Sequence, residues 1–352
     1  MPLREPHWWY ADGTPAMARV LQPIAHVWGA AAIRRHQRGE SFRAELPVVC
    51  VGNLTAGGTG KTPLALLLAE VLNGRGIRPA FLTRGYGGRL RGPHWVRAGI
   101  DAASDVGDEP LLLARAAATL VCSDRALGAK AVAAGPERYG AIIMDDGLQN
   151  GSLAKDLVIA VVDGRRGIGN GLVMPAGPLR APLDYQLGLA DAVVVNMVHG
   201  QRGSGASQGS FPAWLRDNFG GPVLDATTGP VGDVGWLTSG PLLAYSGIGA
   251  PERFFRLLEH EGGRIAGRRA FADHHVYTDA EARELLGKAR ELGAQLCTTE
   301  KDWVRLGVGG VQAELRAATR TLAVRLHFSE PDGLRLAGLI DGLLAVRSLA
   351  GR

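Results

Sequence analysis

The amino-acid sequence predicts an α/β fold, in which a parallel sheet flanked by helices is followed by a second, smaller α/β lobe. Short apolar runs rich in β-branched residues recur along the chain, as at 48–51, 157–163 and 192–196. Such runs are typical of strands that are buried on both faces of a parallel sheet. Segments with helical character alternate with these runs, and this alternation is the pattern of a parallel α/β sheet. Hydrophobic residues make up 46% of the 352 positions, which is enough for a sizeable core.

The stretch from Val48 to Thr62 joins a strand, a glycine-rich loop and the start of a helix. It reads VVCVGNLTAGGTGKT, and Pro63 follows where a helix has its first turn. Backbone N–H groups of such a loop and the helix N-terminus hold phosphate oxygens, Lys61 reaches the β- and γ-phosphates, and Thr62 is a Mg²⁺ ligand. The stretch therefore predicts a nucleotide-binding P-loop and a P-loop NTPase-like sheet. A glycine-rich turn that binds nothing is the alternative.

One position of this loop departs from the strict P-loop pattern. Thr55 stands five residues before Gly60, where the strict pattern has glycine. We expect Gly57 and Gly58 to provide the conformational freedom that the missing glycine would have given.

Acidic residues follow at two further places. Asp145 and Asp146 end an apolar run about 80 residues after the P-loop, where the second half of an NTPase site holds Mg²⁺. Asp108 and Glu109 precede a segment at 111–119 that we expect to be helical. Acids at a helix start are usually caps or dipole partners, although two carboxylates in a nucleotide-binding chain can also hold a metal or take a proton.

Composition excludes some partners and compartments. Lys and Arg total 39 against 34 Asp and Glu, and the net charge of +5 is too small and too evenly spread to indicate nucleic-acid binding. It suits anionic substrates or an anionic membrane surface. The three cysteines lie far apart, which favours a reducing compartment, and we expect Cys50 to be buried. We see no signal peptide and no apolar run long enough to span a bilayer.

The two ends of the chain leave alternatives open. Aromatic residues cluster at 8–10, and the mostly apolar segment 17–38 carries arginines at its ends, so it is either a membrane-interface helix or a helix packed on the core. In the second lobe, Thr278 and Glu281 form a capping box before an amphipathic helix. The run 273–275 (Asp-His-His) is a metal pair, a surface pair, or the source of a histidine that polarises a carboxylate. We expect domains at 1–40, 41–205 and 206–352, with the Gly/Ser-rich segment 201–210 between the last two.

Together these motifs resemble those of the tetraacyldisaccharide 4'-kinase family, the lipid A kinases of Gram-negative bacteria. They occur in the family's order, cover nearly the whole chain, and include the threonine at the P-loop position noted above. The matching stretches are 51–63 (VGNLTAGGTGKTP), 83–87 (TRGYG), 106–110 (VGDEP), 145–149 (DDGLQ), 169–171 (GNG), 175–180 (PAGPLR), 273–274 (DH) and 299–302 (TEKD).

The resemblance implies an activity and a location. The expected reaction is ATP-dependent phosphorylation of the 4'-hydroxyl of a tetraacylated glucosamine disaccharide 1-phosphate, at the cytoplasmic face of the inner membrane. ATP and Mg²⁺ are the expected cofactors, and the N-terminal segment becomes the expected membrane contact. No nucleic acid and no obligate protein partner is expected. A P-loop ATPase that acts as a switch or metallochaperone, a kinase of a soluble small molecule and an inactive membrane-bound scaffold are the alternatives.

The resemblance also implies roles for individual residues. It makes Asp108 the base, with His274 paired to it and Lys61 at the phosphates, and it puts Asp145 and Asp146 near Mg²⁺ with Thr62. The expected ATP-binding residues are Thr55, Ala56, Gly57, Gly58, Thr59, Gly60, Lys61 and Thr62, and the other expected active-site residues are Arg84, Tyr86, Glu109, Gln149 and Arg180. The chain departs from many relatives at Asn150 and Ala181, where they have His and Glu, and no role is assigned to either position.

Overall fold

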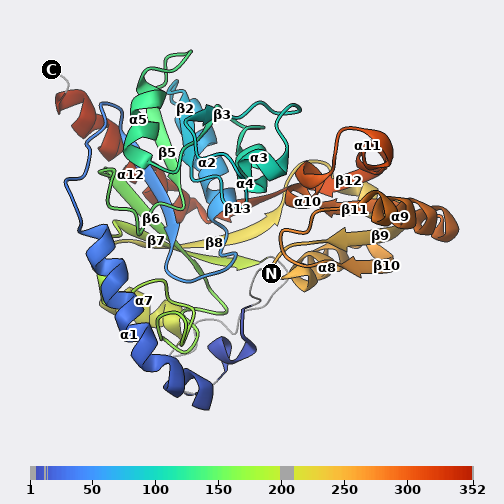
Figure 1. Cartoon of the computed structure of the whole chain (residues 1–352), viewed down its shortest axis with the longest axis horizontal. Helices are drawn as coiled ribbons and strands as arrows, with labels where there is room; N and C mark the ends of the chain where they lie inside the picture. The colour runs from blue at the N-terminus through green and yellow to red at the C-terminus, as the bar shows by residue number, and fades with distance from the viewer. Residues whose placement is uncertain (1–4, 12, 14, 199–209, 351–352) are drawn as a thin grey trace.

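The computed structural model describes residues 5–11, 13, 15–198 and 210–350, and it contains two sheets in two lobes that lie side by side (Figure 1). The predicted α/β class, with a large mainly parallel sheet and a smaller second one, is therefore confirmed. The Gly/Ser-rich segment expected at 201–210 lies, except for Ser210, outside the described residues.

The strands fall into two groups. Those of the first sheet are β1 (Val48–Asn53), β2 (Pro79–Thr83), β3 (His94–Trp95), β4 (Thr119–Val121), β5 (Ala141–Asp145), β6 (Leu157–Asp163), β7 (Ala192–Val198), β8 (Val223–Pro230) and β13 (Val324–Phe328). Those of the second sheet are β9 (Pro241–Ser246), β10 (Arg264–Ala270), β11 (Gln295–Thr299) and β12 (Thr319–Leu322).

The helices connect and cover these strands. The α-helices are α1 (Ala16–His36), α2 (Lys61–Asn73), α3 (Ala103–Val106), α4 (Asp108–Leu113), α5 (Arg125–Ala133), α6 (Leu183–Leu187), α7 (Phe211–Asn218), α8 (Pro251–His260), α9 (Asp279–Leu292), α10 (Glu300–Arg305), α11 (Gly310–Ala318) and α12 (Glu330–Ala350). Two short 3₁₀ helices are η1 (His7–Tyr10) and η2 (Gly235–Thr238).

The first sheet has the order β13-β8-β7-β6-β1-β5-β2-β4-β3. Its strands are parallel except where β13 pairs with β8 and β3 pairs with β4. All six residues of β1 are buried, because β5 and β6 pair with it on either side and helices cover both faces. The loop after β1 therefore leaves the middle of the sheet at the carboxyl ends of its strands, which is where α/β sheets bind ligands.

Two apolar layers cover the two faces of this sheet. One contains side chains from α5, α6 and α7, and the other contains side chains from α2, α4 and α12. The second sheet, in the order β10-β9-β11-β12, is parallel throughout and is likewise covered by α8 on one face and by α9 and α11 on the other. Each lobe thus has its own core, and their relative position is set by what lies between them.

The second lobe is inserted into the first. The chain leaves the first sheet after β8, builds β9 to β12, and returns as β13, which pairs antiparallel with β8. The backbone N–H of Val231 donates to the carbonyl of Ala323, so the outgoing and returning connections run side by side. The expected boundary near residue 205 stays a prediction. After that residue in sequence, β8 and β13 join the first sheet and α12 packs on one of its faces.

Most predicted elements have the expected bounds, and one region differs. The segment 111–119 was expected to be one helix, but α4 ends at Leu113 and a buried strand, β4, begins at Thr119. The difference arises because α4 starts earlier, at Asp108, directly after Gly107. Gly107 has a φ of +93°, and a Cβ there would collide with the carbonyl oxygen of Tyr86, so only glycine fits this turn.

Candidate active site

The P-loop has the conformation that its glycines allow. Gly57 and Gly60 have φ values of +95° and +105°, whereas Thr55 is buried and needs no positive φ. Gly57 and Gly58 were expected to provide the conformational freedom that the missing glycine would have given, and of the two Gly57 has a positive φ. At Gly60 a Cβ would collide with the side-chain amide of Asn196, whose Nδ2 donates to the carbonyl of Thr59 at 2.9 Å. Asn196, at the end of β7, thereby ties the loop to a neighbouring strand.

Lys61 and Arg180 meet at one carboxylate. The Oδ1 of Asp146 lies 3.4 Å from Lys61 Nζ and accepts a hydrogen bond of 2.6 Å from Arg180 Nη1. Burial would raise the pKa of Asp146, but the two cations outweigh it and hold the pKa below its usual range. Arg180, one of the expected active-site residues, is therefore next to the P-loop lysine.

Asp145 has the opposite environment. Both of its carboxylate oxygens are buried and have no hydrogen-bond partner among the described residues. Burial, with the nearby negative charges of Glu109 and Asp146, raises the pKa of Asp145 to about 7, although Lys61 and Lys301 oppose the shift. A buried carboxylate without a partner costs free energy, which a bound cation would offset.

Mg²⁺ fits this position. It prefers oxygen ligands and is usually bound by one or two carboxylates together with phosphate oxygens and water. Asp145 and Asp146 supply two carboxylates, and the buried Thr62 lies in the first turn of α2. Within the described residues no group of three or more His, Cys, Asp or Glu is placed to bind a metal alone.

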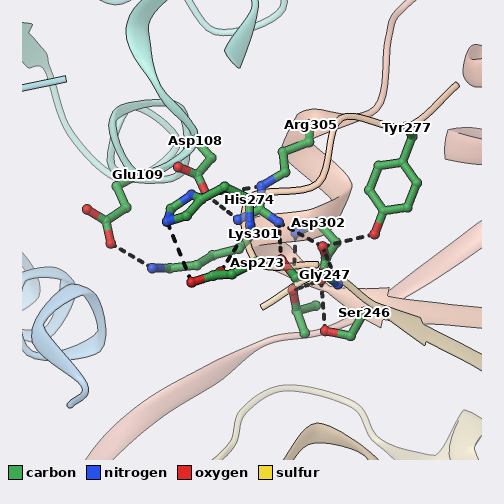
Figure 2. A network of polar contacts seen from close by, with 11 residues as sticks. Asp108, Glu109, Ser246, Gly247, Asp273, His274, Tyr277, Lys301, Asp302 and Arg305 are labelled. Atoms are coloured by element: carbon green, nitrogen blue, oxygen red, sulfur yellow. Dashed lines mark hydrogen bonds and ion pairs between the residues drawn. The ribbon is translucent and has the colours of Figure 1, made fainter. Parts of the chain in front are cut away.

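The first turn of α4 carries two further acids. Asp108 is buried, and its Oδ2 lies 3.2 Å from the Nδ1 of His274 and accepts hydrogen bonds from Arg305. Burial would raise the pKa of Asp108, but the hydrogen bond with His274 and the charges of Arg305 and Lys301 hold it far below its usual range. Asp108 is therefore an anion whose contacts with described residues all go to one oxygen (Figure 2).

His274 reaches Asp108 from the second lobe. It follows β10 in a turn with a φ of +56°, and its backbone N–H donates to the carbonyl of Gly247. Asp146 and His274 are the only non-glycine residues with positive φ in the described part of the chain, and strained backbones of this kind concentrate at functional sites. The hydrogen bond with Asp108 raises the pKa of His274, against burial.

Of the three interpretations of 273–275, the contacts support the histidine that polarises a carboxylate. His275 binds Glu281 at 3.0 Å and stacks on Phe271, whereas His274 binds Asp108, so the two imidazoles have different partners. The ring of Tyr86 lies 5.7 Å from that of His274, edge to face, which brings one more predicted site residue to this pair.

Sequence reasoning missed the cations that hold the α4 acids. Lys301 Nζ lies 2.7 Å from Glu109 Oε1, and Arg305 binds Asp108. The charge of Lys301 lowers the pKa of Glu109, with burial opposing and Lys61 adding to the effect. The motif 299–302 was noted without a role for Lys301, and the signal that would have found Arg305 is its i+4 spacing from that lysine on one helix face.

Two expected site residues lie apart from these contacts. Gln149 Nε2 donates to the carbonyl of Asn53 at 3.0 Å and to Gln186 Oε1 at 2.7 Å, so its amide supports the base of the P-loop. Arg84 is exposed just beyond β2. Of the two departures, Asn150 makes a local turn with Ser152, and Ala181 is buried next to the amide of Gln186.

The N-terminal segment divides its residues between the core and the surface. Trp9 is buried and its indole N–H donates to the carbonyl of Pro175 at 3.1 Å. The fully buried residues of α1 are all small, namely Ala18, Ala25 and Gly29. Five large apolar residues point outward, namely Met17, Val20, Ile24, Val27 and Trp28, with exposed fractions of 49–72%. Among the described residues, no helix has both the length and the apolar character needed to cross a bilayer.

Comparison with known proteins agrees with the motifs. The family model described as tetraacyldisaccharide-1-P 4'-kinase matches residues 17–340. A tetraacyldisaccharide 4'-kinase of Parvibaculum lavamentivorans is 47% identical over 331 residues, covering 92% of this chain and 93% of that protein, and one of Methylobacterium nodulans is 47% identical over 342 residues, covering 97% and 96%.

Solved structures show the same fold. The crystal structure of LpxK from Aquifex aeolicus in complex with ATP superposes with a TM-score of 0.73 at 23% identity, covering 93% of this chain and 99% of that one. The fold, the motifs in their order and the near full-length identity agree, and the chain belongs to the tetraacyldisaccharide 4'-kinase family.

Proposed function

We propose that this kinase transfers the γ-phosphate of ATP to the 4'-hydroxyl of a tetraacylated glucosamine disaccharide 1-phosphate, with Asp108 as the base. The observation that carries the proposal is that two sets of groups lie close together at the carboxyl ends of the first sheet's strands. The first set is the P-loop with Lys61 and Asp145, and the second is Asp108 with His274, which reaches it from the second lobe. Glu109, next to Asp108, lies between them, because the charges of both Lys301 and Lys61 lower its pKa.

The nucleotide would lie along the P-loop. Thr55 and Ala56 begin the loop, and the N–H of Ala56 already donates to the carbonyl of Pro178. The N–H groups of 57–60 and of the first turn of α2 would therefore contact the phosphates, and Lys61 would offset the charge of the γ-phosphate. Mg²⁺, when bound to Asp145, Asp146 and Thr62, supplies charge neutralisation at the phosphates.

Asp108 would accept the proton of the sugar hydroxyl. As the oxygen of the hydroxyl bonds to the γ-phosphorus, the bond from that phosphorus to the β,γ-bridging oxygen breaks, ADP leaves, and the proton passes to the carboxylate. The Nδ1 of His274 lies 3.2 Å from Oδ2, and described residues donate no hydrogen bond to Oδ1. Oδ1 is therefore the oxygen available to the acceptor. Positioning and charge neutralisation lower most of the barrier in such reactions.

Other residues are proposed to line the acceptor site. Tyr86 contacts His274 by its ring and is 61% exposed, so it has surface left for a ligand. Arg84 is exposed two residues before Tyr86. Arg180 donates a hydrogen bond to Asp146, and Glu109 forms an ion pair with Lys301. Gln149 would support the site indirectly, because its side-chain amide donates to the carbonyl of Asn53 at the start of the P-loop.

The lipid acceptor calls for contact with a membrane, and α1 supplies a suitable surface. Its outward residues recur at spacings of three and four, so they form one apolar face, and the exposed Arg34, Arg35 and Arg38 follow at its end. An apolar face flanked by arginines is typical of a helix that lies in the interface of an anionic bilayer. We propose that the enzyme is peripheral to the cytoplasmic face of the inner membrane, without an obligate protein partner or nucleic acid.

The test is transfer of ³²P from γ-labelled ATP to the lipid acceptor in mixed micelles. We expect Asp108→Asn to lower kcat by roughly 10²–10⁴-fold with little change in the KM for ATP, because a general base typically supplies that factor. Asp105→Asn is the matched control, since Asp105 lies three residues earlier on the surface and pairs with Arg89. Hydrolysis of ATP that is equally fast without acceptor would favour the switch or metallochaperone alternative, and no transfer would refute the proposal.

A further inference from the structure

One face of α10 carries the cations that contact the two acids of α4. Lys301 and Arg305 are four residues apart, and they bind Glu109 and Asp108, which are adjacent. Arg305 Nε donates to Asp108 Oδ2 at 3.0 Å, and its Nη2 donates to the same oxygen. Figure 2 shows that these pairs join the two lobes, because the acids come from the first lobe and the cations from the second.

Arg305 is itself held in place on its other side. Its Nη1 donates to the carbonyl of Gly247 at 2.7 Å and to Asp302 Oδ1 at 2.9 Å. Asp302 is fully buried, and it accepts further hydrogen bonds from the hydroxyls of Ser246, Tyr277 and Thr299 and from the backbone N–H of Gly247. The side chain of Arg305 is only 4% exposed. A guanidinium with this many fixed acceptors has a single orientation. Because the guanidinium is planar and rigid, its N–H groups then fix where Oδ2 of Asp108 lies.

We propose that Arg305 is a positioning residue for the phosphoryl transfer: it holds Oδ2 of Asp108 so that Oδ1 is presented to the acceptor hydroxyl. The inference rests on the proposed function, since it concerns how the base is oriented. His274 alone gives Oδ2 one contact, about which the carboxylate can still rotate. With Arg305 added, donors from two elements of the second lobe converge on one oxygen and fix the carboxylate plane.

This arrangement has a consequence for pH dependence. Asp108 is faced by His274 and Asp273 from the turn after β10, by Lys301, Asp302 and Arg305 from α10, and by Glu109 on its own helix. Asp108 must be ionised to accept a proton. Removing the charge of Arg305 leaves a buried carboxylate with fewer cations, so the pKa of Asp108 rises. The acidic limb of the kcat/KM profile should then move toward neutral pH.

The experiment compares Arg305→Met with Arg305→Lys in the full-length enzyme. A misplacement of about 1 Å at a reacting group can cost 10²-fold in rate. We expect Arg305→Met to lower kcat roughly 10²-fold with the KM for ATP within about twofold of wild type, and to shift the acidic limb upward. Arg305→Lys keeps the charge without the fork, so we expect about a tenfold loss and a smaller shift of the limb.

Arg325→Met is the matched control. Arg325 contacts the same helix, because its Nη1 lies 3.1 Å from Glu300 Oε2, but it forms no ion pair with Asp108. The substitution Arg325→Met removes an arginine from the same lobe junction. If kcat fell as much in Arg325→Met as in the Arg305 variants, the loss would be a general effect on lobe packing, and the inference would be overturned.

A second readout does not depend on turnover. The imidazole of His274, followed by NMR in the ATP-free enzyme, should titrate at higher pH in Arg305→Met than in wild type, because the charge of Arg305 opposes its protonation. Should Arg305→Met not fold, Arg305→Gln, which also removes the charge, carries both measurements. Wild-type kcat, pH profile and His274 titration in the folded variant would refute the role of Arg305. Absence of lipid phosphorylation by the wild-type enzyme would instead refute the proposed function.

Discussion

Replacing three outward apolar residues of α1 by serine should detach the enzyme from membranes without harming its catalytic centre. The residues are Val20, Ile24 and Val27, which are 71%, 55% and 72% exposed. Fully burying a side chain of this kind gives about 1.5–3 kcal/mol, so covering the exposed part gives roughly 1 kcal/mol each and about 3 kcal/mol together. Since 1.4 kcal/mol corresponds to a factor of ten, the partition coefficient should fall roughly 100-fold.

The assay is cosedimentation with vesicles of anionic phospholipid. Binding of the wild-type enzyme should also weaken with salt, because the arginines at the C-terminal end of α1 contribute about 1 kcal/mol each near an anionic surface. Turnover of an acceptor with short, water-soluble acyl chains should stay within about twofold of wild type, because the substituted residues point away from the protein.

The matched control is Val308→Ser with Leu334→Ser and Val346→Ser, which are 67%, 67% and 66% exposed on other surfaces. This triple variant removes a similar apolar area and should bind vesicles as the wild-type enzyme does. Equal partitioning of the α1 variant and the wild-type enzyme would show that this face does not contact the bilayer, and the reasoning from its exposure would fail.

Three other changes test the site and its support. Asp145→Asn should stabilise the Mg²⁺-free protein by roughly 1–4 kcal/mol, because the pKa of Asp145 in the folded protein, about 7, lies above its pKa in the unfolded chain. In urea titrations the gain in the free energy of unfolding should be small near pH 4 and grow up to about pH 7, and saturating Mg²⁺ should remove it. Gly60→Ala should lower kcat/KM for ATP by at least about 10²-fold, because the new Cβ would collide with Asn196 and because Gly60 has a positive φ. Gly58 has open space around it, so Gly58→Ala should keep the wild-type melting temperature. Asp302→Asn should cost about 3–5 kcal/mol in urea unfolding, because it leaves buried donors facing an amide; a loss under 1 kcal/mol would contradict the importance of that carboxylate.

The sequence predicted the first sheet's centre well because local signals coincide there. The buried run at 48–53, the glycines and the proline at the start of α2 all indicate one strand–loop–helix unit, and the capping box of α9 has the predicted partners. Strand β10 was not predicted, since RIAGRRA at the sheet edge carries three arginines and no regular alternation, and it is largely exposed. Such an edge strand is defined by its pairing with β9, which no local pattern reveals.

The candidate site was predictable as a set of residues and not as a set of contacts. Asp108, His274 and Lys61 were identified by motif, but Arg305 lies 197 residues from Asp108 in sequence and outside every motif. Gln149 belongs to a predicted motif, yet its amide is engaged with Asn53 and Gln186. Contacts of this kind depend on tertiary packing, which for Arg305 means how the second lobe packs on the first, and residue spacing does not encode it.

The insertion of the second lobe between β8 and β13 limits how the two lobes can move. A domain joined by one linker can twist in any direction, but this one is tethered at two points that run alongside each other at the edge of the first sheet. Relative motion is therefore restricted to a swing about one axis through both tethers. Because Lys301 and Arg305 both belong to α10, a swing that moves this helix would separate them from the α4 acids together, so both carboxylates would lose these cations in a single step.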